Sequence, residues 1–233
     1  MGEFSQRRLI RKLDLERFLA GLAPMTNPKV GLEQYTTSEQ LAANMLYLAA
    51  YNQGDISGKS VLDLGCGTGR LALGALFLGA AYIVGVDIDK AAVKIAVMNS
   101  SKAGLKGGVE WVLGDIAAVE GKFDTVLQNP PFGVQRREAD RAFLIKALEV
   151  GSSVYSLHSH PELDRRLIRQ LKSSGEMLEV SASPFLKRFV EKHGGKVTAV
   201  YANLMTIPKM FDFHTKLRYD FVVDIYVIKK EDL

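Results

Sequence analysis

Residues 61–69 read VLDLGCGTG, an apolar run that passes directly into a glycine-rich turn. The run predicts a buried strand, and the turn after it contains Gly65, Gly67 and Gly69. Glycines allow the backbone to approach a ligand where any Cβ would collide with it. A helix is predicted over residues 70–78, directly after the turn. Strand, glycine turn and helix in this order are typical of an open α/β sheet that binds its ligand beyond the carboxyl ends of the strands.

The same alternation continues along the chain. After the first strand at 60–64, further buried strands are predicted at 82–86, 109–113, 123–128 and 153–157. Two later helices are predicted to begin near Pro161 and Pro184, because proline suits the first position of a helix. The last two β-rich runs, 196–207 and 219–228, have no helix between them, which predicts an antiparallel strand. The fold class is therefore α/β, a doubly wound, seven-stranded and mostly parallel sheet with one antiparallel strand.

The segment before the first strand does not show this alternation of strands and helices. Residues 5–22 place apolar side chains among basic ones at near-helical spacing, which predicts an amphipathic helix. The tetrapeptide Thr37-Ser38-Glu39-Gln40 has the form of a capping box before a second helix. We interpret residues 1–55 as a helical extension that covers the ligand site and residues 56–233 as the core, in one compact domain.

The composition fits one globular domain: 47% of the 233 residues are hydrophobic and 24% are charged. The apolar runs are short for a transmembrane helix, and the first residues lack the apolar core of a signal peptide. The single cysteine, Cys66, excludes an internal disulfide and a cysteine-rich zinc site, and no set of metal ligands stands out. These features indicate an intracellular protein, which we expect in the cytoplasm.

Acidic residues stand at the ends of the predicted strands. Asp87 follows the glycine turn by about twenty residues, where a carboxylate can accept hydrogen bonds from two ribose hydroxyls. Ile88 can cover one face of an adenine, and Asp115 can accept a hydrogen bond from the adenine amine. A nicotinamide dinucleotide would need a glycine where this chain has Arg70, and a merely structural turn would not need the acidic strand ends.

The fourth strand runs into Asn129-Pro130-Pro131-Phe132. A side-chain amide and a backbone carbonyl can accept both N–H groups of a planar amine and draw its nitrogen toward a pyramidal, nucleophilic geometry. The paired prolines stiffen the turn, and Pro131 has no N–H to compete for those acceptors. Phe132 offers a flat face for stacking. With the glycine turn, this tetrapeptide predicts transfer of a methyl group from S-adenosylmethionine to a planar nitrogen, with S-adenosylhomocysteine as the product.

The two motifs together resemble the class I amino-methyltransferases. Three more segments narrow the resemblance: Leu32-Glu33-Gln34-Tyr35, Val154-Tyr155-Ser156-Leu157-His158 and Phe213-His214. With them the chain resembles the methyltransferase-like-five group of archaea and eukaryotes, which forms N6-methyladenosine in small-subunit ribosomal RNA. The likeness covers residues 8–228. It departs most at 161–196, a segment longer than expected that bears on the RNA-docking surface.

The resemblance implies a role for each matching residue. Asn129 and the Pro130 carbonyl would hold the adenine amine, beside Pro131, and Phe132 would stack on the base. The methionine end of the cofactor would be lined by Gln34, Tyr35 and Thr37. The rest of the cofactor would be held by Asp63, Gly65, Gly67, Gly69, Asp87, Ile88, Asp115 and Ile116. Direct in-line transfer needs no dedicated base, so we expect core or rim roles for His158 and His214.

Charge and strand order suggest the partners. The formal net charge is +4, a mild excess compatible with RNA. We expect RNA contacts from Arg136, Arg137, Lys187, Arg188, Lys209, His214 and Lys216. Members of the resembled group pair with a small zinc-binding activator protein, and the strand at 109–113 is predicted to be an edge open to strand addition. Trp111 in that strand either anchors the partner or packs under a neighbouring helix.

Three other functions stay open from the sequence. A protein glutamine N5-methyltransferase needs nearly the same acceptor motif, although such enzymes usually have Tyr in place of Phe132 and an extra N-terminal domain. A DNA adenine methyltransferase shares the chemistry, but no appended target-recognition region is evident. A non-catalytic RNA-binding factor for ribosome assembly would keep the fold, although two intact motifs argue against lost activity.

Overall fold

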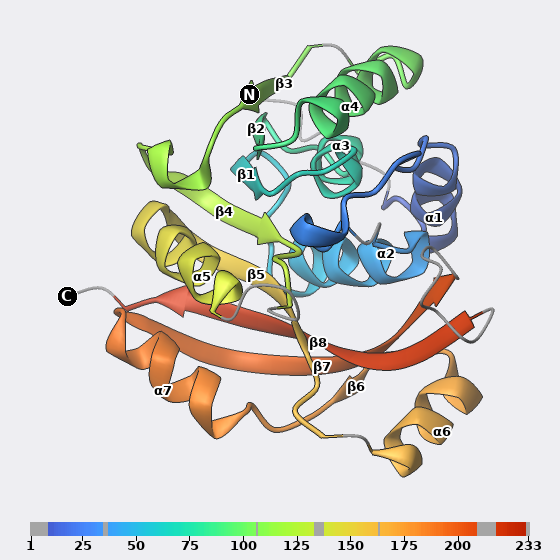
Figure 1. Cartoon of the computed structure of the whole chain (residues 1–233), viewed down its shortest axis with the longest axis vertical. Coiled ribbons are helices and arrows are strands. Elements are labelled where there is room, and N and C mark those ends of the chain that lie inside the picture. Colours follow the sequence, from blue (N-terminus) through green and yellow to red (C-terminus); the bar gives the residue numbers. More distant parts are fainter. Residues whose placement is uncertain are drawn as a thin grey trace, which may run out of the picture.

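The computed structural model describes residues 9–34, 37–105, 107–132, 138–162, 164–208 and 218–231. Within them, one eight-stranded sheet runs through the molecule in the order β3-β2-β1-β4-β5-β8-β7-β6 (Figure 1). The strands are β1 Ser60–Leu64, β2 Tyr82–Asp87, β3 Val109–Leu113, β4 Phe123–Gln128, β5 Gly151–Ser159, β6 Leu178–Glu179, β7 Gly195–Pro208 and β8 Arg218–Lys230. The helices are α1 Lys12–Ala20, α2 Glu39–Tyr47, α3 Arg70–Phe77, α4 Lys90–Lys102, α5 Ala139–Val150, α6 Arg165–Ser174 and α7 Pro184–Lys192, with short turns η1 Val30–Leu32, η2 Leu48–Asn52 and η3 Ile116–Ala118.

The sheet is parallel from β3 to β5 and antiparallel beyond. Strands β3, β2, β1, β4 and β5 pair in parallel. β8 lies antiparallel to both β5 and β7, as the helix-free tail predicted. The sheet has one strand more than expected, because the two-residue β6 adds to the edge of β7. The strand order reverses between β1 and β4, and in open α/β sheets that point forms a ligand crevice.

Side-chain caps mark the starts of α2, α4 and α6, and two predictions about helix starts need correction. The hydroxyl of Ser38, not Thr37, caps α2 by accepting from the Leu41 amide at 3.3 Å, so the predicted capping box began one residue too early. Pro184 is the first residue of α7 as predicted. Pro161 does not begin a helix: α6 starts at Arg165, because the Asp164 carboxylate accepts from two amides of its first turn. The shift of the α2 cap leaves the side chain of Thr37 available elsewhere.

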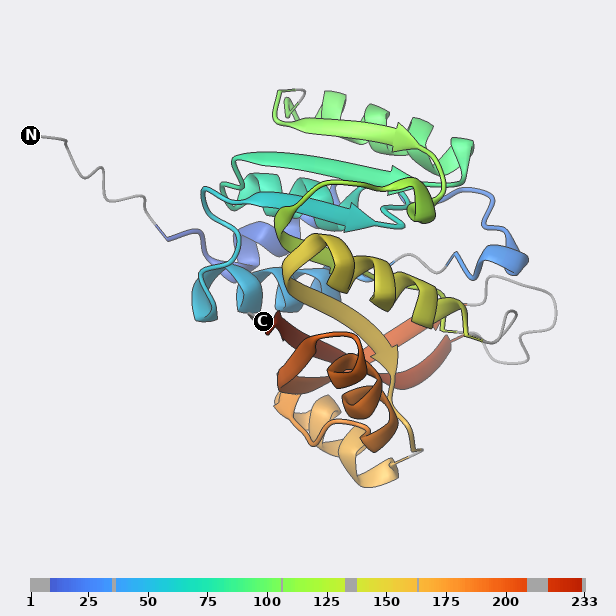
Figure 2. The same ribbon diagram turned by 90° about the vertical axis from the view of Figure 1, so that its left-hand side faces the viewer.

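The described part of residues 1–55 shares its core with the sheet. Leu15 and Leu19 of α1 and Met45 of α2 are fully buried in the same cluster as Leu73 of α3 and Tyr155 of β5. α5 and α7 cover the other face of the sheet, where they pack on β4, β5 and β8 (Figure 1). The extension is therefore packed as one layer against the sheet. It reaches the ligand end of the sheet through η1, which Figure 2 shows at the edge toward which the parallel strands point.

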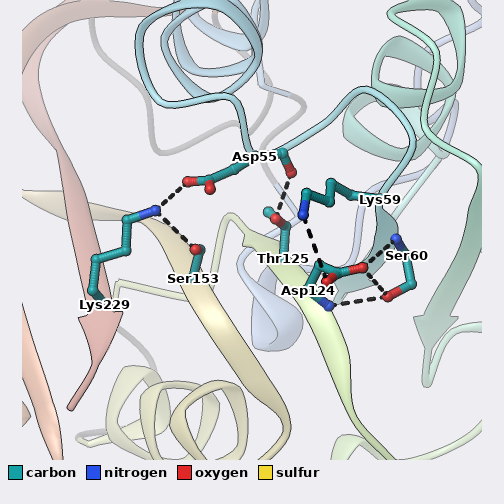
Figure 3. Close-up of polar contacts among 7 residues, drawn as sticks. All are labelled: Asp55, Lys59, Ser60, Asp124, Thr125, Ser153 and Lys229. Atoms are coloured by element: carbon teal, nitrogen blue, oxygen red, sulfur yellow. Dashed lines mark hydrogen bonds and ion pairs between the residues drawn. The ribbon is translucent and has the colours of Figure 1, made fainter. Parts of the chain in front are cut away.

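A polar cluster closes the opposite, amino-terminal end of the parallel strands (Figure 3). The Asp55 carboxylate accepts from Lys229 Nζ at 2.5 Å and from the Tyr155 hydroxyl, and the Asp55 carbonyl accepts from Thr125 Oγ1 at 2.5 Å. Lys229 Nζ also donates to Ser153 Oγ at 2.9 Å. Beside it, the Asp124 carboxylate accepts from Ser60 N and Oγ at 2.8 and 2.7 Å. Residue 55 is thus held by β4, β5 and β8, which joins the extension to the core at this end.

Candidate active site

A cavity of about 490 Å³ opens at the carboxyl ends of β1, β2 and β4. It is lined by residues from the predicted motifs: Gln34, Thr37, Asp63, Gly65, Gly67, Asp87, Ile88, Asp115, Ile116, Asn129 and Pro131. These eleven residues come from the carboxyl ends of β1, β2, β3 and β4 and from the segment between η1 and α2, which the fold brings to one place. Pro130 is buried, and Pro130, Phe132 and Gly69 lie beside the cavity without lining it. Tyr35 lies outside the described residues.

The glycine turn serves packing as well as ligand access. All three glycines have positive φ, from +53° to +82°. A Cβ at Gly67 would meet nothing within 4 Å, so this residue leaves open space beside the cavity. A Cβ at Gly69 would lie 2.4 Å from the Trp111 ring, and one at Gly65 would lie 2.9 Å from Phe143. The Trp111 ring behind the turn therefore requires a glycine at position 69, in addition to any role in ligand access.

The Asp87 carboxylate holds the turn in shape. Its two oxygens accept from the amides of Gly67 and Asp89, each at 2.8 Å. Burial is the largest effect on its pKa and raises it, while the two amides act in the opposite direction. A carboxylate has about four acceptor positions, so two remain for a ligand. Ile88 is 59% exposed beside it, available to cover a flat ring.

Gln34 is held by a second polar cluster that the sequence did not reveal. Its Oε1 accepts from the Lys29 amide and its Nε2 donates to Asp89, both at 2.8 Å. The Lys29 ammonium pairs with the other oxygen of Asp89, also at 2.8 Å. Burial raises the pKa of Asp89, but the hydrogen bonds from Lys29 and Gln34 outweigh it and leave the pKa below its usual value. The cluster fastens the segment around η1 to the start of α4, which Asp89 caps.

The amide of Asn129 is oriented by Thr37. Asn129 Nδ2 donates to Thr37 Oγ1 at 2.8 Å, across 92 positions of sequence. Asn129 Oδ1 is buried and has no hydrogen-bond partner among the described residues. A buried carbonyl without a donor costs free energy on the order of 1–3 kcal/mol, so such an atom suggests a ligand group that supplies one. Phe132 packs edge-on against Phe221 of β8, with ring centroids 6.1 Å apart.

Arg70 lines the cavity, although from the sequence it was expected only to oppose the binding of a dinucleotide. It is 9% exposed, and its Nη1 donates to the Thr37 carbonyl at 2.5 Å. Its Nε is buried without a partner among the described residues. Burial lowers the pKa of its guanidinium. Arg70 is the one cation in the described cavity wall, which also contains five carboxylates: Glu33, Asp63, Asp87, Asp115 and Glu138. The wall therefore suits a ligand with more positive than negative charge.

Asp63 and Cys66 have perturbed protonation. Asp63, at the end of β1, accepts from the Ala72 amide at 2.9 Å, and burial raises its pKa to about 7. Burial also raises the pKa of the Cys66 thiol well above its ordinary value, with the carboxylates of Asp63 and Asp87 acting in the same direction. Cys66 is thus a buried, protonated thiol.

His158 lies in the core. Its Nε2 is 2.8 Å from Ser156 Oγ, which accepts from Gln128 Nε2 at 2.9 Å. Burial lowers the pKa of His158 to about 4, so the imidazole is neutral at neutral pH. It does not line the cavity, which agrees with the core role expected for it.

Two of the seven residues expected to contact RNA lie within the described part of the structure. Lys187 and Arg188 are exposed on α7. The same helix carries Phe185, whose ring lies 4.9 Å from the guanidinium of Arg141 on α5, so α7 begins near the start of α5. The others lie outside the described residues: Arg136, Arg137, Lys209, His214 and Lys216.

Comparison with known proteins first defines the class. Residues 42–130 match the family model described as ribosomal protein L11 methyltransferase (PrmA), a span that contains most of the cavity-lining motifs. A magnesium protoporphyrin IX methyltransferase from Synechocystis, solved with S-adenosylhomocysteine, has the same fold at a TM-score of 0.59, with 17% identity over 94% of each chain. The molecule therefore has the class I methyltransferase fold.

Full-length relatives narrow this class to one family. A Drosophila melanogaster protein named rRNA N(6)-adenosine-methyltransferase Mettl5 is 32% identical, covering 94% of this chain and 96% of the relative. A METTL5 protein of Danio rerio is 40% identical, covering 62% and 72%. A crystal structure of a candidate RNA methyltransferase from Pyrococcus horikoshii has a TM-score of 0.79 at 39% identity, covering 96% and 100%. The chain belongs to the METTL5 family of rRNA N6-adenosine methyltransferases.

Trp111 of β3 packs beneath α4 and behind the glycine turn. The indole Nε1 of Trp111 donates to Ser100 Oγ of α4 at 3.3 Å, and its ring packs on Gly69 and Gly85. Of the two roles considered for Trp111, packing under a helix is confirmed. No helix in the described ranges has the length and apolarity needed to span a bilayer.

Proposed function

We propose that the protein transfers the methyl group of S-adenosylmethionine to N6 of an adenosine in ribosomal RNA, most specifically small-subunit RNA. The observation that carries this proposal is the orientation of Asn129. Its Nδ2 is occupied by Thr37, so its buried Oδ1 is the end of the amide left for a donor. A target amine supplies such a donor. Family membership supports ribosomal RNA as the source of that amine.

The chemistry is a direct displacement. The N6 lone pair of adenine is drawn into the ring, and two acceptors on its N–H groups, Asn129 Oδ1 and the Pro130 carbonyl, make it available. The N–C bond forms as the S–C bond breaks, the sulfonium becomes a neutral thioether, and the amine proton leaves to water. Alignment of two bound reactants contributes on the order of 7–11 kcal/mol to such a step. Phe132, which packs edge-on against Phe221, would stack on the base.

The cavity wall fits the charges of this cofactor. S-adenosylmethionine carries a sulfonium, an ammonium and one carboxylate, and the part of the wall that the structure describes offers five carboxylates and one guanidinium. We assign the cofactor carboxylate to Arg70, whose Nε lacks a partner. Asp87 and Ile88 suit the ribose and adenine, and Asp115 the adenine amine. The wall also includes Met25, Leu32, Gln34 and Thr37, which supports the extension over 1–55 as a cover for the cofactor.

The test is transfer of labelled methyl from S-adenosylmethionine to small-subunit ribosomal RNA, followed by nucleoside analysis. Label in N6-methyladenosine that is lost in Asn129→Ala is the expected result, with S-adenosylhomocysteine affinity unchanged. Label in protein glutamine or in DNA would assign the chain to another methyltransferase class. Cofactor binding without transfer to any acceptor would point to a non-catalytic assembly factor.

We further propose that β3 pairs with a small zinc-binding activator protein in the cytoplasm. β3 is the edge of the sheet, and its Val112 and Leu113 are 42% and 50% exposed. Trp111 points inward, so these two side chains, not Trp111, would contact the partner. Protection of the amides of residues 109–113 from hydrogen exchange on adding the activator is expected. Unchanged exchange in a mixture that co-elutes as a complex would exclude this edge.

A further inference from the structure

Helix α6, Arg165–Ser174, presents an exposed basic face near the outer end of the sheet (Figure 1). Its apolar side is anchored, because Leu167 and Leu171 are buried against Ala202 of β7 and Val222 of β8. Its outward side contains no acidic residue and exposes four cations: Arg165, Arg166, Arg169 and Lys172. The helix belongs to the segment 161–196, which the sequence predicts to depart most from the family pattern.

Three of these cations form no close ion pair within the described residues, although the Asp164 carboxylate at the start of the helix lies near Arg166. Arg165, Arg166 and Arg169 form no ion pair with any described residue, and Arg169 donates only to the Arg165 carbonyl, at 3.3 Å. By contrast, the basic side of α1 is neutralised by pairs with Asp14 and Glu16. Two arginines in the first turn of α6 also oppose the helix dipole, which favours negative charge there. Helix stability therefore does not by itself explain three exposed arginines here, and their N–H donors suit an anion.

The face contains a shallow hollow lined by Arg166, Arg169, Gln170 and Ser173. These positions follow i, i+3, i+4 and i+7, so they lie on one side of the helix. Guanidinium, amide and hydroxyl groups all offer N–H or O–H donors, and no carboxylate lines the hollow. Phosphate oxygens are acceptors that arginine binds well.

Two contacts connect α6 with the acceptor site. Lys172 pairs with Asp220 of β8, whose neighbour Phe221 holds Phe132 in place. At the end of the helix, the Gly175 carbonyl accepts from Gln40 of α2 at 3.4 Å, three residues after Thr37. α6 is thus tied to β8, the strand that carries Phe221, and to α2, the helix that begins two residues after Thr37.

We propose that the arginine face of α6 binds the phosphate backbone of the RNA that flanks the target adenosine. The proposal rests on the proposed function, since it takes the RNA substrate as the occupant. Backbone contacts of this kind position the substrate without reading its sequence. They act before the chemical step, so they contribute to RNA affinity and not to the rate of transfer once RNA is bound.

The experiment compares Arg166→Gln/Arg169→Gln with Lys94→Gln/Lys102→Gln, which removes two exposed charges from α4. A transcript of small-subunit ribosomal RNA is titrated at several salt concentrations with S-adenosylhomocysteine present. We expect the α6 variant to bind RNA about five- to thirty-fold more weakly, as for two lost charge contacts. The slope of log affinity against log salt should become shallower by about 1.4. In methylation assays KM for RNA should rise with kcat unchanged.

The controls separate the two proposals. S-adenosylhomocysteine affinity should equal that of the unmodified protein in both variants, which also reports intact folding. A charge-conserving Arg166→Lys/Arg169→Lys variant should retain most of the RNA affinity. Normal methylation with RNA affinity and salt slope unchanged in the glutamine variant would overturn the role of α6 alone. A chain that methylates no RNA even before mutation would overturn the proposed function, and this inference with it.

Discussion

Arg70→Met tests the charge arrangement of the cavity most directly. The change removes the one cation in the described wall and leaves five carboxylates facing the ligand. If Arg70 holds the cofactor carboxylate, S-adenosylhomocysteine should bind much more weakly. 5′-Methylthioadenosine, which keeps the adenosine and thioether but lacks the amino-acid end, should bind as before.

The magnitude follows from the burial of Arg70. A hydrogen bond to a charged partner contributes about 1.5–3 kcal/mol, and a side chain that is 9% exposed is little screened by solvent. A loss of about 2–3 kcal/mol corresponds to a Kd for S-adenosylhomocysteine about 30- to 150-fold higher. Arg70→Lys should show an intermediate loss, because lysine keeps the charge but not the planar fork of donors.

Calorimetric titration of both ligands into the three proteins provides the measurement. Arg70 also holds the Thr37 carbonyl at 2.5 Å, so the mutation alters more than charge. The methylthioadenosine titration controls for that disturbance. An equal loss of affinity for both ligands would refute the assignment, since Arg70 would then support the shape of the cavity and not bind the carboxylate.

Four shorter predictions concern other parts of the molecule. Thr37→Val removes the acceptor for Asn129 Nδ2 and should lower kcat about tenfold in single-turnover assays, whereas Thr37→Ser should not. Because the pKa of Asp63 is about 7, its carboxylate is deprotonated above that pH and then attracts a cationic cofactor. The affinity for S-adenosylmethionine should rise as the pH increases through 7, and in Asp63→Asn it should not depend on pH in this range. The pKa of His158 is about 4 in the folded protein and about 6.5 in the unfolded chain. As the pH falls from the higher value to the lower, the unfolded chain binds a proton that the folded protein does not. In urea unfolding, the free energy of unfolding should fall by an amount on the order of 3 kcal/mol as the pH is lowered through this range. An equal fall in His158→Gln would contradict the reasoning. Gly69→Ala places a Cβ 2.4 Å from Trp111 at φ +82° and should lower the free energy of unfolding by about 2–4 kcal/mol, whereas Gly104→Ala, also at positive φ but in open space, should cost about 1 kcal/mol.

Much of the fold follows from local patterns in the sequence. The apolar runs, the glycines after β1 and Pro184 at the start of α7 act on their own neighbours, so they predict strands, turns and a helix start where the structure has them. The prediction that a helix begins near Pro161 is wrong because proline only permits a helix start, while the Asp164 carboxylate stabilises one. β6 was missed because two residues carry no periodicity, and only pairing with β7 makes them a strand.

Some features of the site could likewise be predicted from the sequence, and others could not. The motifs around Asp63, Asp87 and Asn129 could be read from the chain alone, because strand ends bring them to one edge of the sheet regardless of side-chain detail. Only the tertiary structure decided that Thr37 orients Asn129, that Arg70 is the one cation beside five carboxylates in the described cavity wall, and that Trp111 packs against Gly69. Each is a contact between side chains far apart in sequence or on different elements, and such contacts depend on how helices pack on the sheet, which no local pattern specifies.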